Sequence, residues 1–150
     1  MQIIILSDIH ISEDLVQAVL KRHEKETGAI IFCGDGLALM QALNPGLPLY
    51  AVKGNCDRGN APLSLEFQLS GFRFFLTHGH IFQVKNGLSL LKQRTFKQPF
   101  DFVLFGHTHQ PYREKIKHSV FFNPGALCEY HYGLLTLFEK DYYLEHCQIK

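Results

Sequence analysis

Strand-length apolar segments that end in polar turns are the feature of this sequence that most constrains its fold. In six places such a segment runs into a tight or glycine-containing turn that carries Asp, Asn or His. The segments and their turn residues are Ile3–Leu6 with Asp8 and His10, Ile30–Phe32 with Asp35, Tyr50–Val52 with Asn55 and Asp57, Phe72–Leu76 with His78 and His80, Phe102–Phe105 with His107 and His109, and Val120–Phe122 with Asn123. In open α/β sheets, ligands bind outside the carboxyl ends of the strands, so we expect these polar side chains to gather in one place.

Helical patterns separate the early apolar segments. Ser12 and the two acidic residues after it are typical of a helix N-cap and first turn. An amphipathic stripe continues from there to near Gly28. Shorter helices are predicted over Leu37–Leu43 and Leu88–Phe96. The first half of the chain is therefore predicted to have a βαβ arrangement.

The second half predicts mostly antiparallel strands. Leu63–Leu69 alternates apolar and polar residues, and a Ser-Gly turn then leads into Phe72–Leu76, which predicts a hairpin. An antiparallel meander without a clear helix is predicted from Tyr112–Ile116, Val120–Phe122, Leu134–Phe138 and Tyr142–Gln148. Together with the βαβ pattern, these strands predict an α/β protein of two packed sheets flanked by helices.

Composition limits the class of protein. The chain has 150 residues and no internal repeat or polar linker, so residues 1–150 are predicted to form a single domain. A net charge of +1 argues against a protein that tracks long nucleic acid or a membrane surface. No signal-peptide pattern or bilayer-length apolar run is present, and the four cysteines show no C-x-x-C spacing. These features predict a cytoplasmic protein with reduced thiols.

The polar turns together predict a metal site. Taken singly, most are ordinary turn chemistry, because Asp8 can cap its own turn and Gly34-Asp35 is a common turn pair. His107 and His109 are a stronger signal, since histidines two residues apart can project the same way from an extended segment. Mixed nitrogen and oxygen ligands without thiolate suit Mn²⁺, Fe, Zn²⁺ or Ni²⁺ better than Ca²⁺.

The same turns carry a resemblance to a known family. The succession Asp-x-His, Gly-Asp, Gly-Asn-x-Asp, His-Gly-His and Gly-His-Thr-His, between Met1 and about Gly125, resembles the calcineurin-like metallophosphoesterases. The short chain and its Gly54-Asn55-Cys56-Asp57 turn are similar to the small YfcE-like phosphodiesterase branch, and more distantly to a retromer subunit. The resemblance implies a four-layer αββα fold, in which a β-sandwich of two mixed sheets is flanked by helices.

The resemblance also implies a binuclear metal centre. Two divalent ions per chain are expected, Mn²⁺ first and Fe, Ni²⁺ or Zn²⁺ as alternatives. Asp8, His10 and His109 would hold one ion, Asn55, His78 and His107 the other, and Asp35 would bridge them. Such a centre clamps the attacking and leaving oxygens of an in-line displacement. The implied activity is hydrolysis of small phosphodiesters by in-line attack of a metal-bridging hydroxide.

Three further residues are candidates for catalytic and substrate-binding roles. Cys56 occupies the position at which many larger relatives have a histidine that protonates the leaving group or holds the phosphate, and a thiol is a poor acid for an alkoxide. His80 is a candidate catalytic group or a hydrogen-bond partner of a metal ligand. Arg58 is a candidate substrate contact or a solvated loop residue, and Asn55 is a second candidate substrate contact.

Alternative functions stay open at this point. The first is a non-catalytic metal-binding scaffold for protein interactions, like the retromer subunit. A nuclease on long DNA or RNA is disfavoured, because the chain lacks a surplus of basic residues. Small family members often associate, so the resemblance also allows a homo-oligomer. A small phosphoester is the expected partner, and no membrane partner is expected.

Overall fold

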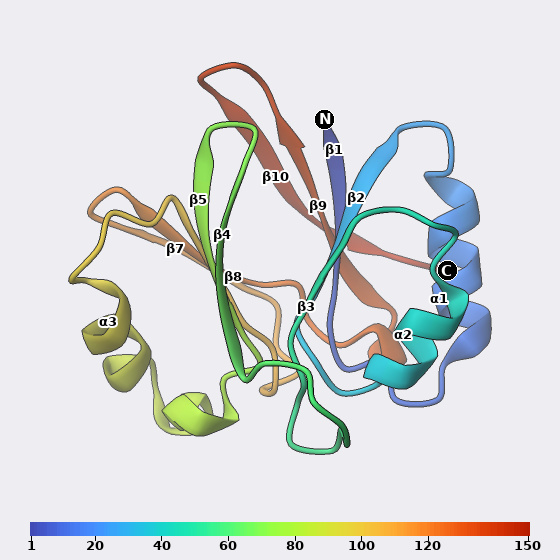
Figure 1. Cartoon of the computed structure of the whole chain (residues 1–150), viewed down its shortest axis with the longest axis horizontal. Helices are drawn as coiled ribbons and strands as arrows, with labels where there is room; N and C mark the ends of the chain where they lie inside the picture. Colours follow the sequence, from blue (N-terminus) through green and yellow to red (C-terminus); the bar gives the residue numbers. More distant parts are fainter.

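The computed structural model describes residues Met1–Lys150 as two five-stranded sheets with helices on both outer surfaces (Figure 1). The first sheet contains β1 (Gln2–Leu6), β2 (Thr27–Phe32), β3 (Leu49–Ala51), β9 (His131–Leu137) and β10 (Tyr142–Gln148), in the order β10-β9-β1-β2-β3. The second contains β4 (Ser64–Leu69), β5 (Phe72–Thr77), β6 (Phe102–Leu104), β7 (Tyr112–Ile116) and β8 (Ser119–Asn123), in the order β4-β5-β6-β8-β7.

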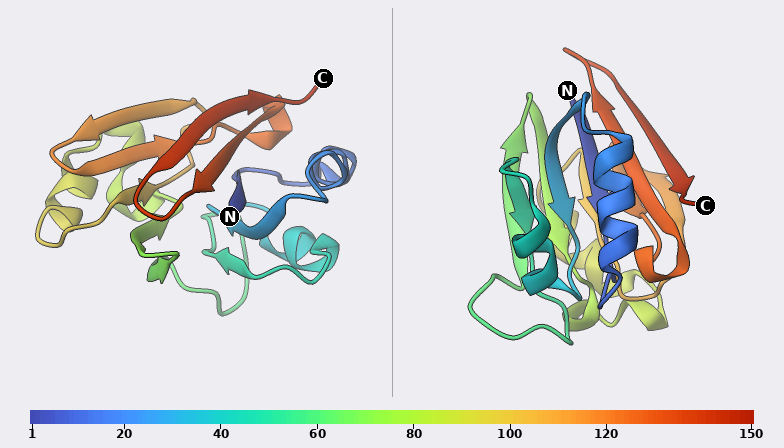
Figure 2. Two further views of the ribbon diagram at one scale, coloured as in Figure 1. Left: turned by 90° about the horizontal axis from the view of Figure 1, so that it is seen from above. Right: turned by 90° about the vertical axis from the view of Figure 1, so that its right-hand side faces the viewer.

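Three α-helices and three short 3₁₀ helices complete the chain. The α-helices are α1 (Glu13–Arg22), α2 (Leu37–Leu43) and α3 (Ser89–Thr95), and the 3₁₀ helices are η1 (His80–Phe82), η2 (Val84–Asn86) and η3 (Leu127–Glu129). Helices α1 and α2 cover the outer face of the first sheet, and α3 lies on the outer side of the second (Figures 1 and 2). The predicted four-layer αββα fold is confirmed.

The apolar segments are continuous because their strands are covered on both faces. In β1, Ile3 and Ile5 face the core between the sheets, whereas Ile4 and Leu6 pack with residues of α1 and α2. A strand buried on both faces has no position for a polar side chain, so it does not alternate. The edge strand β4 does alternate, because only one of its faces packs on the core between the sheets.

The βαβ prediction is confirmed, but the end of its first helix was predicted wrongly. Strands β1, β2 and β3 are parallel, and α2 begins and ends where the sequence predicts. Helix α1 ends at Arg22, so the apolar stripe that extends to near Gly28 already belongs in part to β2. The amide and hydroxyl of Thr27 both donate to the carbonyl of His23, at 3.1 and 2.8 Å, and this turn ends the helix. Ser12 precedes the helix as predicted, but its side chain makes no capping hydrogen bond.

The predicted C-terminal meander is also wrong. Strands β7 and β8 form a hairpin in the second sheet, whereas β9 and β10 form a hairpin in the first. Strand β8 pairs in parallel with β6, and β9 pairs antiparallel with β1, so the chain changes sheet between them. Periodicity reports which face of a strand is buried. It does not report which sheet the strand joins.

Gly133 in β9 lies against the ring of Phe122 in the opposite sheet. A Cβ atom at this position would lie 2.7 Å from Cε1 of Phe122 in the opposite sheet. Gly133→Ala is therefore expected to lower the free energy of unfolding by about 1–3 kcal/mol, measured by urea denaturation. Adding Phe122→Leu should make the Gly133→Ala change less costly, because it removes the clashing ring atoms. This explanation would be contradicted if Gly133→Ala lowered the free energy of unfolding by the same amount whether residue 122 was Phe or Leu.

Candidate metal centre

The turns that carry the predicted ligands meet at one edge of the sandwich. Strands β1 and β2 run in parallel, as do β5 and β6, so their carboxyl ends lie together at the lower edge in Figure 1. Backbone hydrogen bonds join the turns, from the amide of Asp8 to the carbonyl of Gly34 and from the amide of Gly106 to the carbonyl of His78, both at 2.9 Å. The structure therefore brings the predicted ligands of both sheets together.

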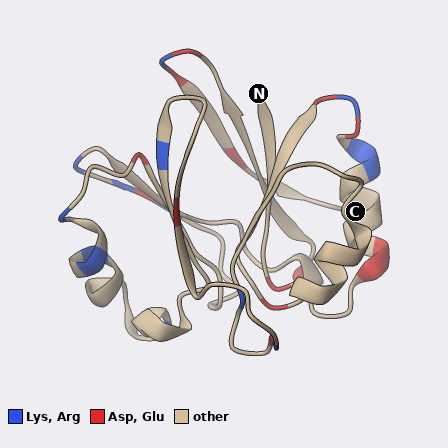
Figure 3. Cartoon of the chain, viewed as in Figure 1, with Lys and Arg blue, Asp and Glu red and all other residues tan.

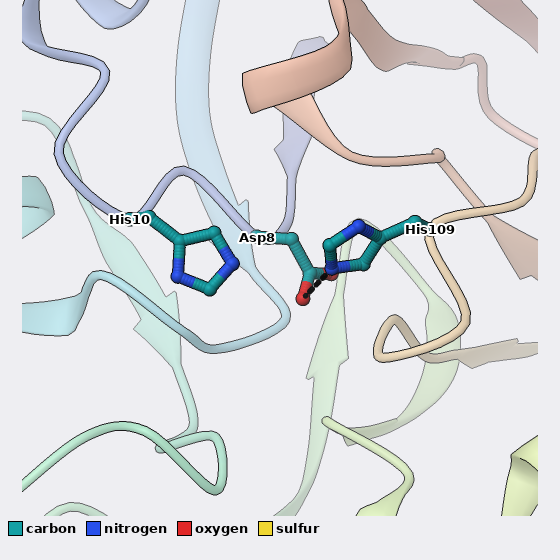
Figure 4. Close-up of side chains that lie close together, drawn as sticks. All are labelled: Asp8, His10 and His109. Atoms are coloured by element: carbon teal, nitrogen blue, oxygen red, sulfur yellow. Dashed lines mark ion pairs between the residues drawn. The ribbon is translucent and has the colours of Figure 1, made fainter.

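Asp8, His10 and His109 form what we call the first ligand group (Figure 4). One ligand atom from each lies within 4.8 Å of the others, and Oδ1 of Asp8 is 3.2 Å from Nε2 of His109. The Asp8 side chain is fully buried, and its Oδ2 accepts from the Ser7 hydroxyl and the His107 amide. Its Oδ1 has no hydrogen-bond partner. A buried carboxylate oxygen that faces imidazole nitrogens without a proton donor fits a bound cation.

Asn55, His78 and His107 form the second ligand group, which is centred on Nε2 of His78. This nitrogen lies 3.1 Å from Oδ1 of Asn55, 3.2 Å from Nδ1 of His107 and 3.2 Å from Oδ2 of Asp35. Nδ1 of His78 lies 2.8 Å from the carbonyl oxygen of Cys33, which can only accept a hydrogen bond. His78 therefore carries its proton on Nδ1 when neutral, which leaves Nε2 free to bind a metal.

Asp35 lies between the two groups. It shares one cluster of ligand atoms with Asp8 and His78 and another with His10 and Cys56. Burial alone would raise the pKa of Asp35, but the hydrogen bond and charge of His78 and the amide of Cys56 bring this pKa below its ordinary value. The side chain is therefore ionised at neutral pH. An ionised carboxylate between two groups of ligands is suited to bridge two cations.

Asp57 organises the backbone around Asp35. Its carboxylate accepts hydrogen bonds from four amides, those of Asp35, Gly36 and Gly54 at 2.8 Å and that of Leu37 at 3.0 Å. Burial alone would raise the pKa of Asp57, but these four donors lower it. Sequence reasoning assigned no role to Asp57, although the Gly-Asn-x-Asp spacing was available as a signal.

Five of the seven predicted ligands have a left-handed backbone conformation. Their φ angles are 53° at Asp8, 50° at His10, 67° at Asp35, 69° at His107 and 63° at His109. Residues other than glycine rarely adopt such angles, and the strain persists only where the surrounding structure holds it. Such strain is concentrated at functional sites in proteins.

Neither Cys56 nor His80 is well suited to donate a proton at neutral pH, because the thiol holds its proton too tightly and the imidazole is largely unprotonated. Burial first, and then the carboxylate of Asp35, raise the pKa of the Cys56 thiol. Burial first, and then the charge of His78, lower the pKa of His80. The imidazole of His80 lies 5.5 Å from that of His78 and 6.1 Å from that of His107, between ring centroids. Its Nδ1 is buried without a hydrogen-bond partner.

A surface groove of about 500 Å³ begins at the centre. His10 and Cys56 line the part of it next to the ligand groups, and its other walls include the apolar side chains of Ile11 and Leu39. Arg58 also lines the groove, is exposed and forms no ion pair with a carboxylate. The groove therefore offers an apolar surface and one unpaired positive charge next to the centre.

Residues 1–139 match the calcineurin-like phosphoesterase superfamily domain. The chain belongs to this superfamily. The probable metallophosphoesterase YsnB of Bacillus subtilis is 34% identical over 129 residues, which cover 85% of this chain and 75% of YsnB. The phosphodiesterase YfcE of Escherichia coli K12 is 30% identical over 154 residues, which cover 85% of this chain and 79% of YfcE. The family resemblance and the prediction of a metal-dependent phosphoester hydrolase are confirmed.

Solved structures share the fold of this phosphoesterase. A predicted phosphoesterase from Streptococcus pneumoniae has a TM-score of 0.79 at 24% identity, and the match covers 98% of this chain and 88% of that one. Vps29 from Chaetomium thermophilum has a TM-score of 0.75 at 15% identity, and the match covers 98% and 97% of the two chains. At these identities the likeness shows the fold alone.

The surface of the phosphoesterase carries charges of both signs. Figure 3 shows basic and acidic residues interspersed over helices, strands and loops, in keeping with the net charge of +1. None of its helices combines the length and the apolar character that a transmembrane helix requires.

Asp57→Asn is expected to lower the free energy of unfolding by about 2–3 kcal/mol at pH 7, because an amide cannot satisfy four backbone donors. Folding lowers the pKa of Asp57, so its contribution is complete above the unfolded-state pKa of about 3.9 and is lost as the pH falls through the folded-state pKa. Urea denaturation between pH 3 and pH 7 measures both effects. The exposed Asp14→Asn is the control. A difference between wild type and Asp57→Asn that does not shrink in acid would contradict this assignment.

Proposed function

We propose that this phosphoesterase is a binuclear metal-dependent phosphodiesterase that acts on small phosphodiesters. The observation that carries the proposal is the convergence of seven donor side chains around two fully or nearly fully buried carboxylates, Asp8 and Asp35, one of which has an oxygen that accepts no hydrogen bond. The first ligand group would hold one ion and the second ligand group the other, with Asp35 shared. Mn²⁺ is the expected metal, with Fe, Ni²⁺ or Zn²⁺ as alternatives, because mixed nitrogen and oxygen donors suit all four.

The charge of the site favours a phosphate ester. When bound, two divalent ions supply Lewis-acid charge to the phosphoryl oxygens and a water-derived nucleophile at neutral pH. Asp8 and Asp35 neutralise only half of the charge of two dications, and the imidazoles and the Asn55 amide add none. The excess positive charge would attract an anionic ester, and the Asn55 amide would help to orient its oxygens.

The groove supports a diester as the substrate. A diester has a second arm beyond the scissile bond, and the apolar walls at Ile11 and Leu39 give this arm a surface to contact. Arg58 places a positive charge along the same groove. Because Cys56 and His80 are weak proton donors at neutral pH, the site favours esters whose leaving group is stable without protonation.

The second candidate function is a metal-binding scaffold for protein interactions. Exposed apolar residues beside the centre favour it, since Ile11 is 93% exposed and Tyr130 is 56% exposed. A scaffold on this fold would bind metal without turning over an ester. Activity measurements on the metal-loaded protein separate the two functions.

Metal-stripped protein is expected to hydrolyse bis-p-nitrophenyl phosphate only after Mn²⁺ is restored, and to prefer it to p-nitrophenyl phosphate. Asp35→Asn is expected to lower turnover by more than about 100-fold and to lower the metal content too, because outer partners of metal ligands alone contribute 10–100-fold. Metal analysis and diester hydrolysis measure the two effects, with Asp14→Asn as the control. Full activity in Asp35→Asn would contradict the bridging role. Two bound ions in wild type without turnover would support the scaffold.

Cys56→Ala is expected to retain the bound metal and most of the diester hydrolysis, because a protonated thiol contributes little as an acid or as a ligand. Cys56→His is expected to raise hydrolysis of an ester with an alkoxide leaving group relative to hydrolysis of bis-p-nitrophenyl phosphate by about tenfold or more, since an imidazole can protonate a leaving group that is unstable as an anion. Steady-state rates on both substrates give the ratio. A ratio equal to that of wild type would contradict the role assigned to the weak acid.

A further inference from the structure

Glu129 is the one carboxylate outside the predicted ligand set that forms an ion pair with a ligand histidine. Its Oε2 atom lies 3.3 Å from Nδ1 of His109. On the other side of the same ring, Nε2 of His109 lies 3.2 Å from Oδ1 of Asp8, the contact drawn in Figure 4. The imidazole therefore lies between two carboxylates, one buried in the centre and one at its rim.

Backbone hydrogen bonds attach Glu129 to the turn that carries Asp8. Glu129 is the last residue of η3, and the amide of Leu127, its first residue, donates to the carbonyl of Ser7 at 2.9 Å. The amide of Cys128 donates to the carbonyl of Asp8 at 3.2 Å. Asp8 and Glu129 thus belong to backbone segments that are hydrogen-bonded to each other. In an ordinary surface ion pair, by contrast, the two partners move independently.

We propose that Glu129 is a positioning residue that holds His109 ready to bind a metal through Nε2, and that it makes the first ligand group the tighter of the two metal sites. A carboxylate that accepts the Nδ1 proton leaves the lone pair of Nε2 free and fixes the plane of the ring. This proposal rests on the two-metal centre proposed above.

The second ligand group has no equivalent of Glu129. The outer nitrogen of His78 faces the backbone carbonyl of Cys33, a neutral acceptor. The carboxylates near His78 are those of Asp8 and Asp35, which belong to the ligand set, and His107 pairs with none. A hydrogen bond to a charged acceptor is about twice as strong as one to a neutral acceptor. The two sites therefore differ in the charge behind their imidazoles and are expected to fill in order.

The expected loss of metal affinity on removal of the Glu129 carboxylate depends on how far the Glu129 and His109 side chains are exposed to water. Loss of a hydrogen-bond partner behind a metal ligand weakens metal binding by 10–100-fold. The side chains of Glu129 and His109 are 55% and 34% exposed, so water screens their interaction. We therefore expect a change of about tenfold, at the lower end of that range.

The experiment is a titration of the metal-stripped full chain with Mn²⁺, with free Mn²⁺ followed by electron paramagnetic resonance. Glu129→Gln keeps the shape of the side chain and removes its charge, so it is expected to weaken the tighter site by about tenfold and leave the weaker site unchanged. Hydrolysis of bis-p-nitrophenyl phosphate by this variant should return to the wild-type kcat at saturating Mn²⁺. Glu129→Ala should weaken the tighter site at least as much.

The matched control is Glu66→Gln. Glu66 pairs with Arg94 at the same distance, 3.3 Å, with both side chains 41% exposed, and it forms no contact with the centre. The proposal would be overturned if Glu129→Gln bound Mn²⁺ with the same affinities as Glu66→Gln, or if it weakened both sites equally. It would also be overturned if a lowered unfolding temperature of Glu129→Gln accounted for the loss of Mn²⁺ affinity. A wild-type chain that binds fewer than two Mn²⁺ would overturn this proposal and the two-metal centre together. Two Mn²⁺ bound unequally without ester hydrolysis would reject the phosphodiesterase function while supporting the role of Glu129.

Discussion

Backbone hydrogen bonds between the turns are the interactions on which this centre depends. The turns after β1, β2, β5 and β6 contain little regular structure, and each is held by the others. Asp8 and His10 are fixed through the carbonyls of Gly34 and Asp35, and the turn before His107 is fixed through the carbonyl of His78. The amide of His107, after β6, donates to Oδ2 of Asp8, after β1, so the candidate ligands of the two sheets reach their relative positions only when the sheets have packed.

Local patterns in the sequence were sufficient to predict much of the fold. Helix α2 and the parallel order of β1, β2 and β3 could be predicted because periodicity, turn residues and strand length agree there. The end of the first helix was predicted too late, since the chain turns after Arg22 and β2 begins at Thr27. The exchange of sheets between β8 and β9 is a long-range choice, decided by the vacant edges of β6 and β1. No short segment of the sequence contains that information.

The candidate ligands could be singled out in the sequence because each one follows a buried strand within a recognisable motif. Asp57 and Glu129 lie just as close to the chemistry, but they act on backbone amides and on another ligand. Asp57 was missed although it belongs to the same turn as Asn55, because its partners lie some 20 residues away in the sequence. Glu129 belongs to no motif. Residues that support ligands are specified by three-dimensional contacts, so a short sequence motif does not identify them.

The left-handed backbone conformations of the candidate ligand residues lower the stability of the folded chain at the positions that the proposed function needs. At positions such as His107 and His109, glycine would relax the backbone, and that relief would stabilise the folded chain while removing a ligand. A population evolved for heat resistance alone would therefore be expected to lose its metal ligands early, while the sandwich around them survived. Loss of these candidate ligands is therefore expected to cost this chain little stability.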